Sequence, residues 1–146
     1  MLILNSNAFT QTLAPLASLP LLYYLEATSN QLSGSLSPLS STPFLISLGL
    51  RDNAFTGTLA SLGGLRALQR LDLSLNYLSQ QLAPLADLTR LTELDLKNNA
   101  FTGPLSSLAG LTRLIYLDIS NNPFIGDARA LGVSFLDLFD NNLGII

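Results

Sequence analysis

The chain has 146 residues, of which 48% are apolar and 12% charged, and its formal net charge is -3 at pH 7. It is too apolar for a disordered chain, and its charge does not suit nucleic acid, whose phosphates need clustered Lys and Arg. Cysteine and histidine are absent, which excludes disulfides, thiolate chemistry, the commonest general base and the commonest metal ligand.

In chain order, the sequence repeats one unit in which a leucine-rich stretch leads to an asparagine. Six asparagines follow one another at intervals of 23 residues, and a seventh follows after 19. Most have a leucine five residues before them, as in Leu71-Asp72-Leu73-Ser74-Leu75-Asn76. Alternating apolar residues predict a short strand, and the fixed period predicts stacked coils. The asparagines are Asn7, Asn30, Asn53, Asn76, Asn99, Asn122 and Asn141.

After each asparagine, the unit continues with a Phe or Leu two residues on, often a Gly, and then further leucines. The pattern resembles the L-x-x-L-x-L-x-x-N signature of leucine-rich repeats. The N-x-F-x-G-x-L run resembles the plant-type repeat of receptor-kinase ectodomains and polygalacturonase inhibitors. The unit is one residue shorter than the usual plant-type unit, Leu-(Ala/Ser)-(Pro/Ser) replaces its Ile-Pro, and the cysteine-bearing caps are missing.

This resemblance implies an α/β solenoid, a right-handed superhelix with a parallel concave β-sheet and short turns or 3-10 segments on the convex side. Residues 1–146 are expected to form a single domain of this kind. The asparagine side chains are expected to turn inward and bond the backbone, and the phenylalanines to form a packed spine. Pro15, Pro38 and Pro84 share one convex position, where they forbid a long helix.

The residues between the strand leucines are expected to share the concave face, because strand side chains alternate. Four aspartates, from Asp72 to Asp137, would stand about 5 Å apart there, with aromatic residues flanking them. One interpretation is that Leu-Asp-Leu is ordinary repeat consensus on a wet surface. The other is that the acidic row receives a basic peptide or protein. This second interpretation predicts a partner-binding site made of Tyr24, Glu26, Arg51, Arg70, Asp72, Glu93, Asp95, Lys97, Tyr116, Asp118, Phe135, Asp137 and Phe139.

Self-association is an alternative function, because the sequence begins inside a strand and ends in Leu143-Gly144-Ile145-Ile146. Apolar end faces and exposed strand edges invite pairing, so two copies are expected to meet through their ends or their concave faces.

Ice binding is a more remote alternative, suggested by hydroxyl residues that recur beside the glycine of each unit. A regular lattice of this kind is similar to the ice-binding faces of β-solenoid antifreeze proteins, but hydroxyls also suit a short exposed strand. The rows break at Gln81, Pro104 and Asp127. Their members are Thr10, Thr12, Ser33, Ser35, Thr56, Thr58, Ser79 and Thr102.

Catalysis is not expected, because only the aspartates remain as reactive groups and a smooth concave sheet offers no enclosed cleft. No cofactor or metal is expected either, since no calcium-loop spacing occurs. No apolar run approaches the ~18 residues of a membrane span. The sequence has no visible signal peptide, cysteine or N-glycosylation sequon, which favours the cytoplasm unless the chain is a fragment.

Overall fold

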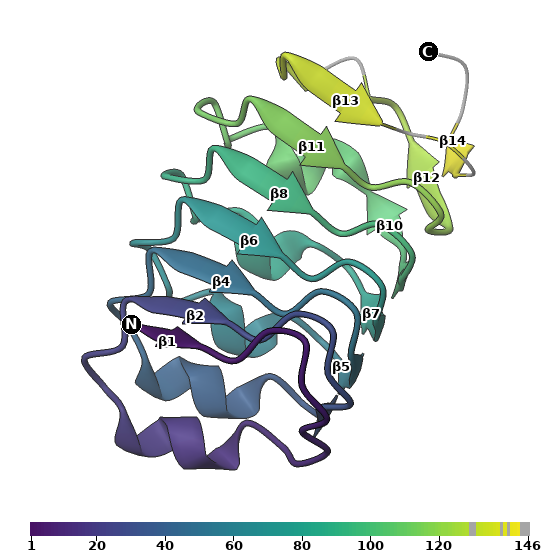
Figure 1. Cartoon of the computed structure of the whole chain (residues 1–146). Helices are drawn as coiled ribbons and strands as arrows, with labels where there is room; N and C mark the ends of the chain where they lie inside the picture. The colour runs from purple at the N-terminus through teal and green to yellow at the C-terminus, as the bar shows by residue number, and fades with distance from the viewer. Residues whose placement is uncertain (129–130, 138, 140, 144–146) are drawn as a thin grey trace.

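Seven short parallel strands form one continuous sheet along a curved solenoid (Figure 1). The computed structural model describes residues 1–128, 131–137, 139 and 141–143. Each strand pairs with the equivalent strand of the next coil, which confirms the predicted parallel sheet. The strands are β1 (Leu2–Ile3), β2 (Tyr24–Glu26), β4 (Ser47–Gly49), β6 (Arg70–Asp72), β8 (Glu93–Asp95), β11 (Tyr116–Asp118) and β13 (Phe135–Asp137).

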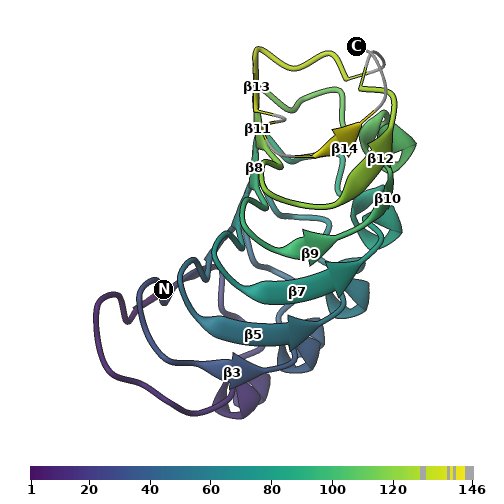
Figure 2. The same ribbon diagram turned by 90° about the vertical axis from the view of Figure 1, so that its right-hand side faces the viewer.

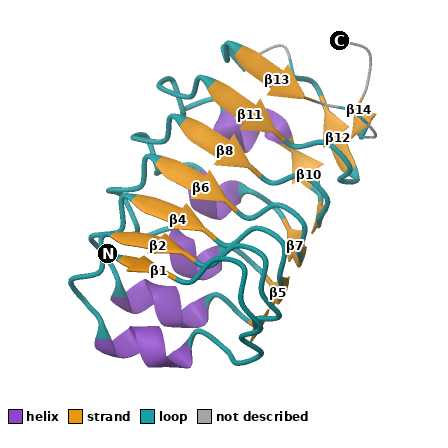
Figure 3. Ribbon diagram, viewed as in Figure 1, coloured by secondary structure: helices purple, strands orange, loops and turns teal. Residues whose placement is uncertain are grey.

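Two further sides complete each coil (Figures 2 and 3). A second row of short strands follows the asparagine turns and forms a four-stranded and a three-stranded sheet. Helical segments close the convex side, and in the described part of the chain all of them are 3-10 helices, as predicted. The second row contains β3 (Ser33–Gly34), β5 (Ala54–Gly57), β7 (Tyr77–Gln80), β9 (Ala100–Phe101), β10 (Gly103–Pro104), β12 (Phe124–Gly126) and β14 (Asn142–Leu143). The 3-10 helices are η1 (Ala14–Ser18), η2 (Ser37–Ser41), η3 (Ala60–Leu62), η4 (Ala83–Leu85) and η5 (Leu105–Leu108).

The prolines explain where several of these helices begin. Pro15, Pro38 and Pro84 lie in the first turn of η1, η2 and η4. Proline has no backbone N–H to donate and its φ suits the start of a helix, so it is tolerated there but not further in. The convex position predicted for these prolines is therefore confirmed.

The leucines on either side of each outward strand residue form the core. Leu71, Leu94 and Leu117 are almost fully buried, and the buried leucines of successive coils form one continuous cluster. A single coil cannot cover its own apolar face, so each coil is stabilised by its neighbours. Burying a leucine contributes about 1.5–3 kcal/mol, which explains the strict period of the sequence.

The asparagines form an inward ladder, as expected from the resemblance. The Asn76 side-chain amide donates to the carbonyl oxygens of Leu50, Leu73 and Ser74 at 3.0, 3.1 and 3.1 Å. Its Oδ1 accepts the backbone N–H of Phe55 from the preceding coil at 3.0 Å. One side chain thus bonds four backbone groups in two coils, and of these the Ser74 carbonyl also accepts the backbone N–H of Asp52.

The phenylalanine spine is present in the middle of the solenoid but not at its first coil. Phe55, Phe101 and Phe124 are fully buried, and the rings of the last two stack with centroids 6.5 Å apart. The prediction is wrong for Phe9, which is 44% exposed. Phe9 lies in the first coil that the structure describes, where its ring lines an open apolar hollow.

Candidate functional site

The sheet register places the predicted site residues in three rows on the concave face. We define this face as the outward side chains of the seven-stranded sheet, together with the residues just beyond its strands. These strands are β1, β2, β4, β6, β8, β11 and β13. The Asp137 side chain lies outside the described residues. The first row holds Tyr24, Arg70, Glu93, Tyr116 and Phe135, and the second holds Glu26, Asp72, Asp95, Asp118 and the backbone of Asp137. The third row holds Arg51, Lys97 and Phe139, whose carbonyl groups continue the inter-coil hydrogen bonds past the strand ends.

Aspartates of the second row have a structural role that the sequence analysis did not assign. Oδ1 of Asp72 accepts hydrogen bonds from the backbone N–H and the hydroxyl of Ser74, at 3.1 and 2.7 Å. Asp118 holds Ser120 in the same way, at 2.9 and 2.6 Å. Such bonds to the residue two positions on stabilise the turn that ends the strand. The recurring Asp-x-Ser spacing was the signal that could have revealed this role.

An ion-pair bridge crosses the first half of the concave face. Nη1 of Arg70 lies 2.9 Å from Oε1 of Glu26, and Nε of Arg70 lies 3.2 Å from Oε2 of Glu93. The Glu26 carboxylate reaches Arg70 by lying directly over the backbone of Gly49 on the strand between them. A residue with a side chain at position 49 would close this route. The glycine inside the strand is the sequence feature that permits the bridge.

The expectation of an exposed acidic row is therefore wrong for two of its members. Glu26 is only 7% exposed and Asp118 only 6%, because the first packs over Gly49 and the second is held by Ser120. Asp72 and Asp95 remain half-buried and in contact with solvent. Among the described side chains of the second row, the accessible negative charge thus concentrates on these two aspartates.

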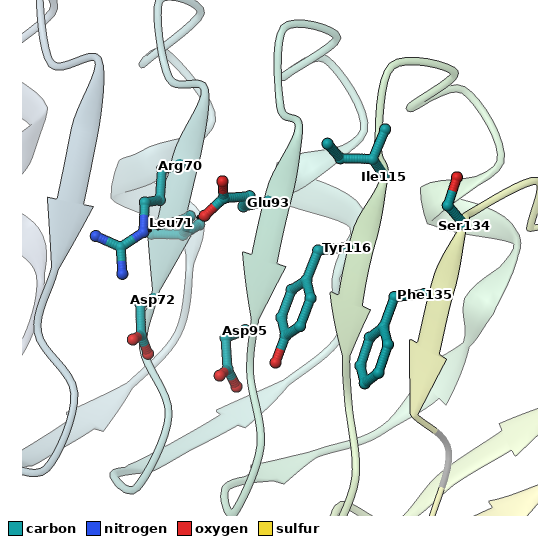
Figure 4. Close-up of a pocket in the computed structure, with 9 residues that line it drawn as sticks. All are labelled: Arg70, Leu71, Asp72, Glu93, Asp95, Ile115, Tyr116, Ser134 and Phe135. Atoms are coloured by element: carbon teal, nitrogen blue, oxygen red, sulfur yellow. Dashed lines mark ion pairs between the residues drawn. The ribbon is translucent and has the colours of Figure 1, made fainter.

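An open hollow of about 640 Å³ lies over β6, β8, β11 and β13. Carboxylates stand on one side of it, and aromatic rings stand on the other (Figure 4). The rings of Tyr116 and Phe135 are parallel within 2° and stack with centroids 4.8 Å apart. The hollow is lined by Arg70, Leu71, Asp72, Glu93, Asp95, Ile115, Tyr116, Ser134 and Phe135.

The carboxyl group of Asp95 has an unusually high pKa. Its pKa is raised from 3.8 to about 6, mainly by burial and also by the nearby charges of Asp72 and Asp118. The Lys97 N–H, which donates to Asp95 at 3.1 Å, and the positive charge of Arg51 only partly oppose this shift of the pKa. A strongly shifted group that lines a hollow is a candidate for function, because a ligand charge can relieve the cost of its ionisation.

The remaining predicted site residues lie away from the hollow. Tyr24 is partly exposed near the first coils, on the far side of the Arg70 bridge. Arg51 is exposed, Lys97 is half-buried, and Phe139 is exposed beyond the end of β13. The structure therefore gathers Arg70, Asp72, Glu93, Asp95, Tyr116 and Phe135 of the predicted set around one hollow.

The hydroxyl rows lie on the second side of the coil, where most of their members are exposed. The strands of this side are staggered, so that Ser33 pairs with Ala54 and Ser79 with Ala100. Equivalent hydroxyls of successive coils are therefore not directly opposite each other.

Three other features bear on the predictions. An apolar hollow at the first coil is lined by Leu2, Leu4, Phe9 and Leu13 among others. In the part of the chain that the structure describes, no three carboxylate side chains come together as a metal site would require. Nor does any described helix have the length and apolar character to cross a membrane.

Comparison with sequence families gave a match between residues 89–132 and the family described as "Leucine Rich repeats (2 copies)". No curated protein matches the sequence at a significant level.

Solved structures resemble the whole fold. The Arabidopsis receptor kinase HAESA, in complex with the peptide hormone IDA and the co-receptor SERK1, is 32% identical with a TM-score of 0.91 over 99% of this chain and 26% of that one. The leucine-rich-repeat ectodomain of GASSHO1/SCHENGEN3 from Arabidopsis thaliana, in complex with CASPARIAN STRIP INTEGRITY FACTOR 2, is 32% identical with a TM-score of 0.90, over 98% of this chain and 18% of that one. A plant ice-binding protein is 25% identical with a TM-score of 0.76, over 98% of this chain and 57% of that one. The chain thus spans about a quarter or less of the length of the two receptors.

Proposed function

Because the chain is a leucine-rich-repeat protein with repeats of the plant type, we propose that it is a non-catalytic scaffold that binds a protein or peptide on its concave face. The hollow over β6 to β13 carries this proposal. It combines exposed aromatic and aliphatic surface with a few carboxylates, the mixture typical of binding sites. The two receptors are described with a peptide hormone and with an integrity factor bound, which supports a peptide or protein as the ligand class.

The proposal can be tested by selecting ligands from a random peptide display library on the immobilised protein. Selected peptides are then titrated by calorimetry against the wild type and against Phe135→Ser, which removes an exposed ring from the hollow. We expect a loss of affinity of about tenfold or more, as for an aromatic anchor.

Tyr77→Ser is the matched control, because Tyr77 is also an exposed aromatic residue but belongs to β7 on the second side of the coil. Its replacement should leave binding unchanged. Peptides that lose affinity with Tyr77→Ser and keep it with Phe135→Ser would place the binding surface elsewhere.

Self-association is a second candidate function, favoured by the apolar hollow at the first coil and by the exposed rings of Phe135 and Phe139. The residues Ile145 and Ile146 that the sequence analysis added to this surface lie outside the described residues. Sedimentation over a range of concentrations tests it, and a monomer at the highest concentration contradicts it. A dimer that survives Phe135→Ser but not Phe9→Ser would locate the contact at the end face.

Ice binding is a third candidate, favoured by the exposed hydroxyls of the second side and by the likeness to a plant ice-binding protein. The breaks in the rows at Gln81, Pro104 and Asp127 weaken it, since ice requires regularly matched hydroxyls. An assay of ice recrystallisation with the wild type and with Thr56→Tyr decides the matter. Inhibition that is absent, or that is unchanged by the bulky substitution, removes this candidate.

The compartment stays a prediction. The absence of a visible signal peptide, of cysteines and of sequons favours the cytoplasm. In contrast, the GASSHO1/SCHENGEN3 structure is described as the ectodomain of a plant membrane receptor kinase. That likeness does not favour the cytoplasm.

A further inference from the structure

The concave face is divided into a closed half and an open half. In the first half, Arg70 pairs with both Glu26 and Glu93, so that one net negative charge remains, and the Glu26 carboxylate covers Gly49. In the second half, the hollow is bordered by the paired Arg70 and Glu93 and exposes the carboxylates of Asp72 and Asp95 to a ligand. Among the described residues, this hollow is therefore one place on the face where the charge of a ligand can be recognised.

The carboxylates of Asp72 and Asp95 can each accept further hydrogen bonds from a cationic ligand. They stand on the adjacent strands β6 and β8 as direct register partners, about 5 Å apart. Each uses Oδ1 for its own turn, and among the described residues neither forms a salt bridge. Their mutual repulsion adds to the effect of burial in raising the pKa of Asp95. A positive charge placed between them would relieve that repulsion.

An aromatic wall stands beside these carboxylates. Phe135 stacks against the Tyr116 ring from the β13 side, and this contact fixes the plane of the Tyr116 ring. The opposite face of the ring is directed towards Asp95 on β8, as Figure 4 shows. A flat cation can lie on an aromatic face while its N–H groups reach the neighbouring carboxylates.

The protein itself holds one guanidinium group in a comparable way. Arg70 binds the carboxylates of Glu26 and Glu93, which come from different strands of the same sheet. The spacing of the strands therefore suits a fork of N–H donors that bridges acidic groups of separate coils. In the next row, Asp72 and Asp95 offer a similar pair of acidic groups.

We propose that the hollow binds the guanidinium group of an arginine side chain of the partner, with Asp72 and Asp95 as its anionic contacts and Tyr116 as its stacking surface. This inference rests on the proposed function and names the side chain that anchors the partner. Lysine binds less well, because its compact ammonium group neither stacks on the ring nor donates from a planar fork.

The test uses three short peptides that differ only in their central residue: acetyl-Gly-Arg-Gly-amide and its lysine and citrulline counterparts. Each is titrated into the labelled protein at pH 7.5 to roughly 20 mM and followed by NMR, a range that reaches very weak complexes. We expect the arginine peptide to shift the amide signals around β8 and β11. The lysine peptide should bind several-fold more weakly, and the neutral citrulline peptide should not bind measurably.

Asp95→Asn and Asp72→Asn should each weaken the arginine peptide about fivefold or more. The matched control is Asp87→Asn, which removes an exposed carboxylate that pairs with Arg66 at 2.9 Å on the rim, away from the hollow. It should leave the titration unchanged. Thermal melts of all variants confirm that they are folded.

The inference is overturned if the arginine peptide does not bind, if citrulline binds equally well, or if Asp87→Asn has the same effect as Asp95→Asn. The display selection separates this failure from that of the proposed function. Selected peptides that depend on Phe135 but contain no essential arginine would leave the scaffold role intact and refute only the arginine anchor.

Discussion

Asn76→Ala is the sharpest test of how this solenoid holds together. Asn76 is 6% exposed and lies in a central coil. The substitution removes an acceptor from the Phe55 N–H and a donor from three carbonyl groups. Alanine cannot replace any of these bonds, and the site is too closed for water to enter freely.

The size of the stability loss depends on which of these backbone groups keep another hydrogen-bond partner in Asn76→Ala. The Leu50 carbonyl still accepts the amide of Asn53, and the Leu73 carbonyl still accepts that of Asn99. Within the described part of the chain, the buried Phe55 N–H has no side-chain acceptor other than Asn76. Leaving one buried donor unsatisfied costs about 1–3 kcal/mol, so we expect a loss of about 2 kcal/mol and a fall in Tm of roughly 4–8 °C.

Urea unfolding monitored by circular dichroism measures this loss. Asn7→Ala is the matched control, because Asn7 is exposed and donates to the carbonyls of Leu4 and Asn5 within its own coil. Its replacement should change the free energy of unfolding by under about 0.5 kcal/mol. Equal losses for the two variants would refute the view that the buried, inter-coil bonds stabilise the stack.

Three further substitutions are expected to change the free energy of unfolding, two of them raising it and one lowering it. Asp95→Asn should raise the free energy of unfolding at pH 7 by roughly 1–2 kcal/mol, because the amide keeps the acceptor for the Lys97 N–H and cannot ionise. The raised pKa means that the folded protein holds this proton more tightly, so the advantage should grow from pH 4 to about 6 and be absent at pH 4 in thermal melts. Gly49→Ala should destabilise the protein by about 1–2 kcal/mol, because the new Cβ collides with the Glu26 carboxylate; if Glu26→Ala does not relieve most of this loss in the double variant, the collision is not its cause. Leu75→Asn should stabilise the protein by up to about 1 kcal/mol, since φ is +55° at this position and asparagine tolerates that region better; a fall in Tm would contradict this account.

The candidate site was only partly predictable. Sequence spacing placed Asp72, Asp95, Tyr116 and Phe135 on one face, and the sheet register agrees. It treated Glu26 and Asp118 as equivalent to the other acidic residues, although both are buried. Burial at these positions depends on which side chain the neighbouring coil presents, such as the absence of one at Gly49, and a single repeat does not contain that information.

The sequence by itself determined the coil, its strand, its asparagine turn and its convex proline, because each follows from a period that recurs along the whole chain. That period fixes which side chains face the core, since a slip of one residue would expose every leucine. Only the tertiary structure decided how the outward side chains divide the concave face into an ion-pair bridge and an open hollow. These contacts join residues of different coils, such as Glu26 and Arg70, whose side chains meet across an intervening strand. Long flexible side chains choose among several neighbours, and the choice depends on space and charge in three dimensions.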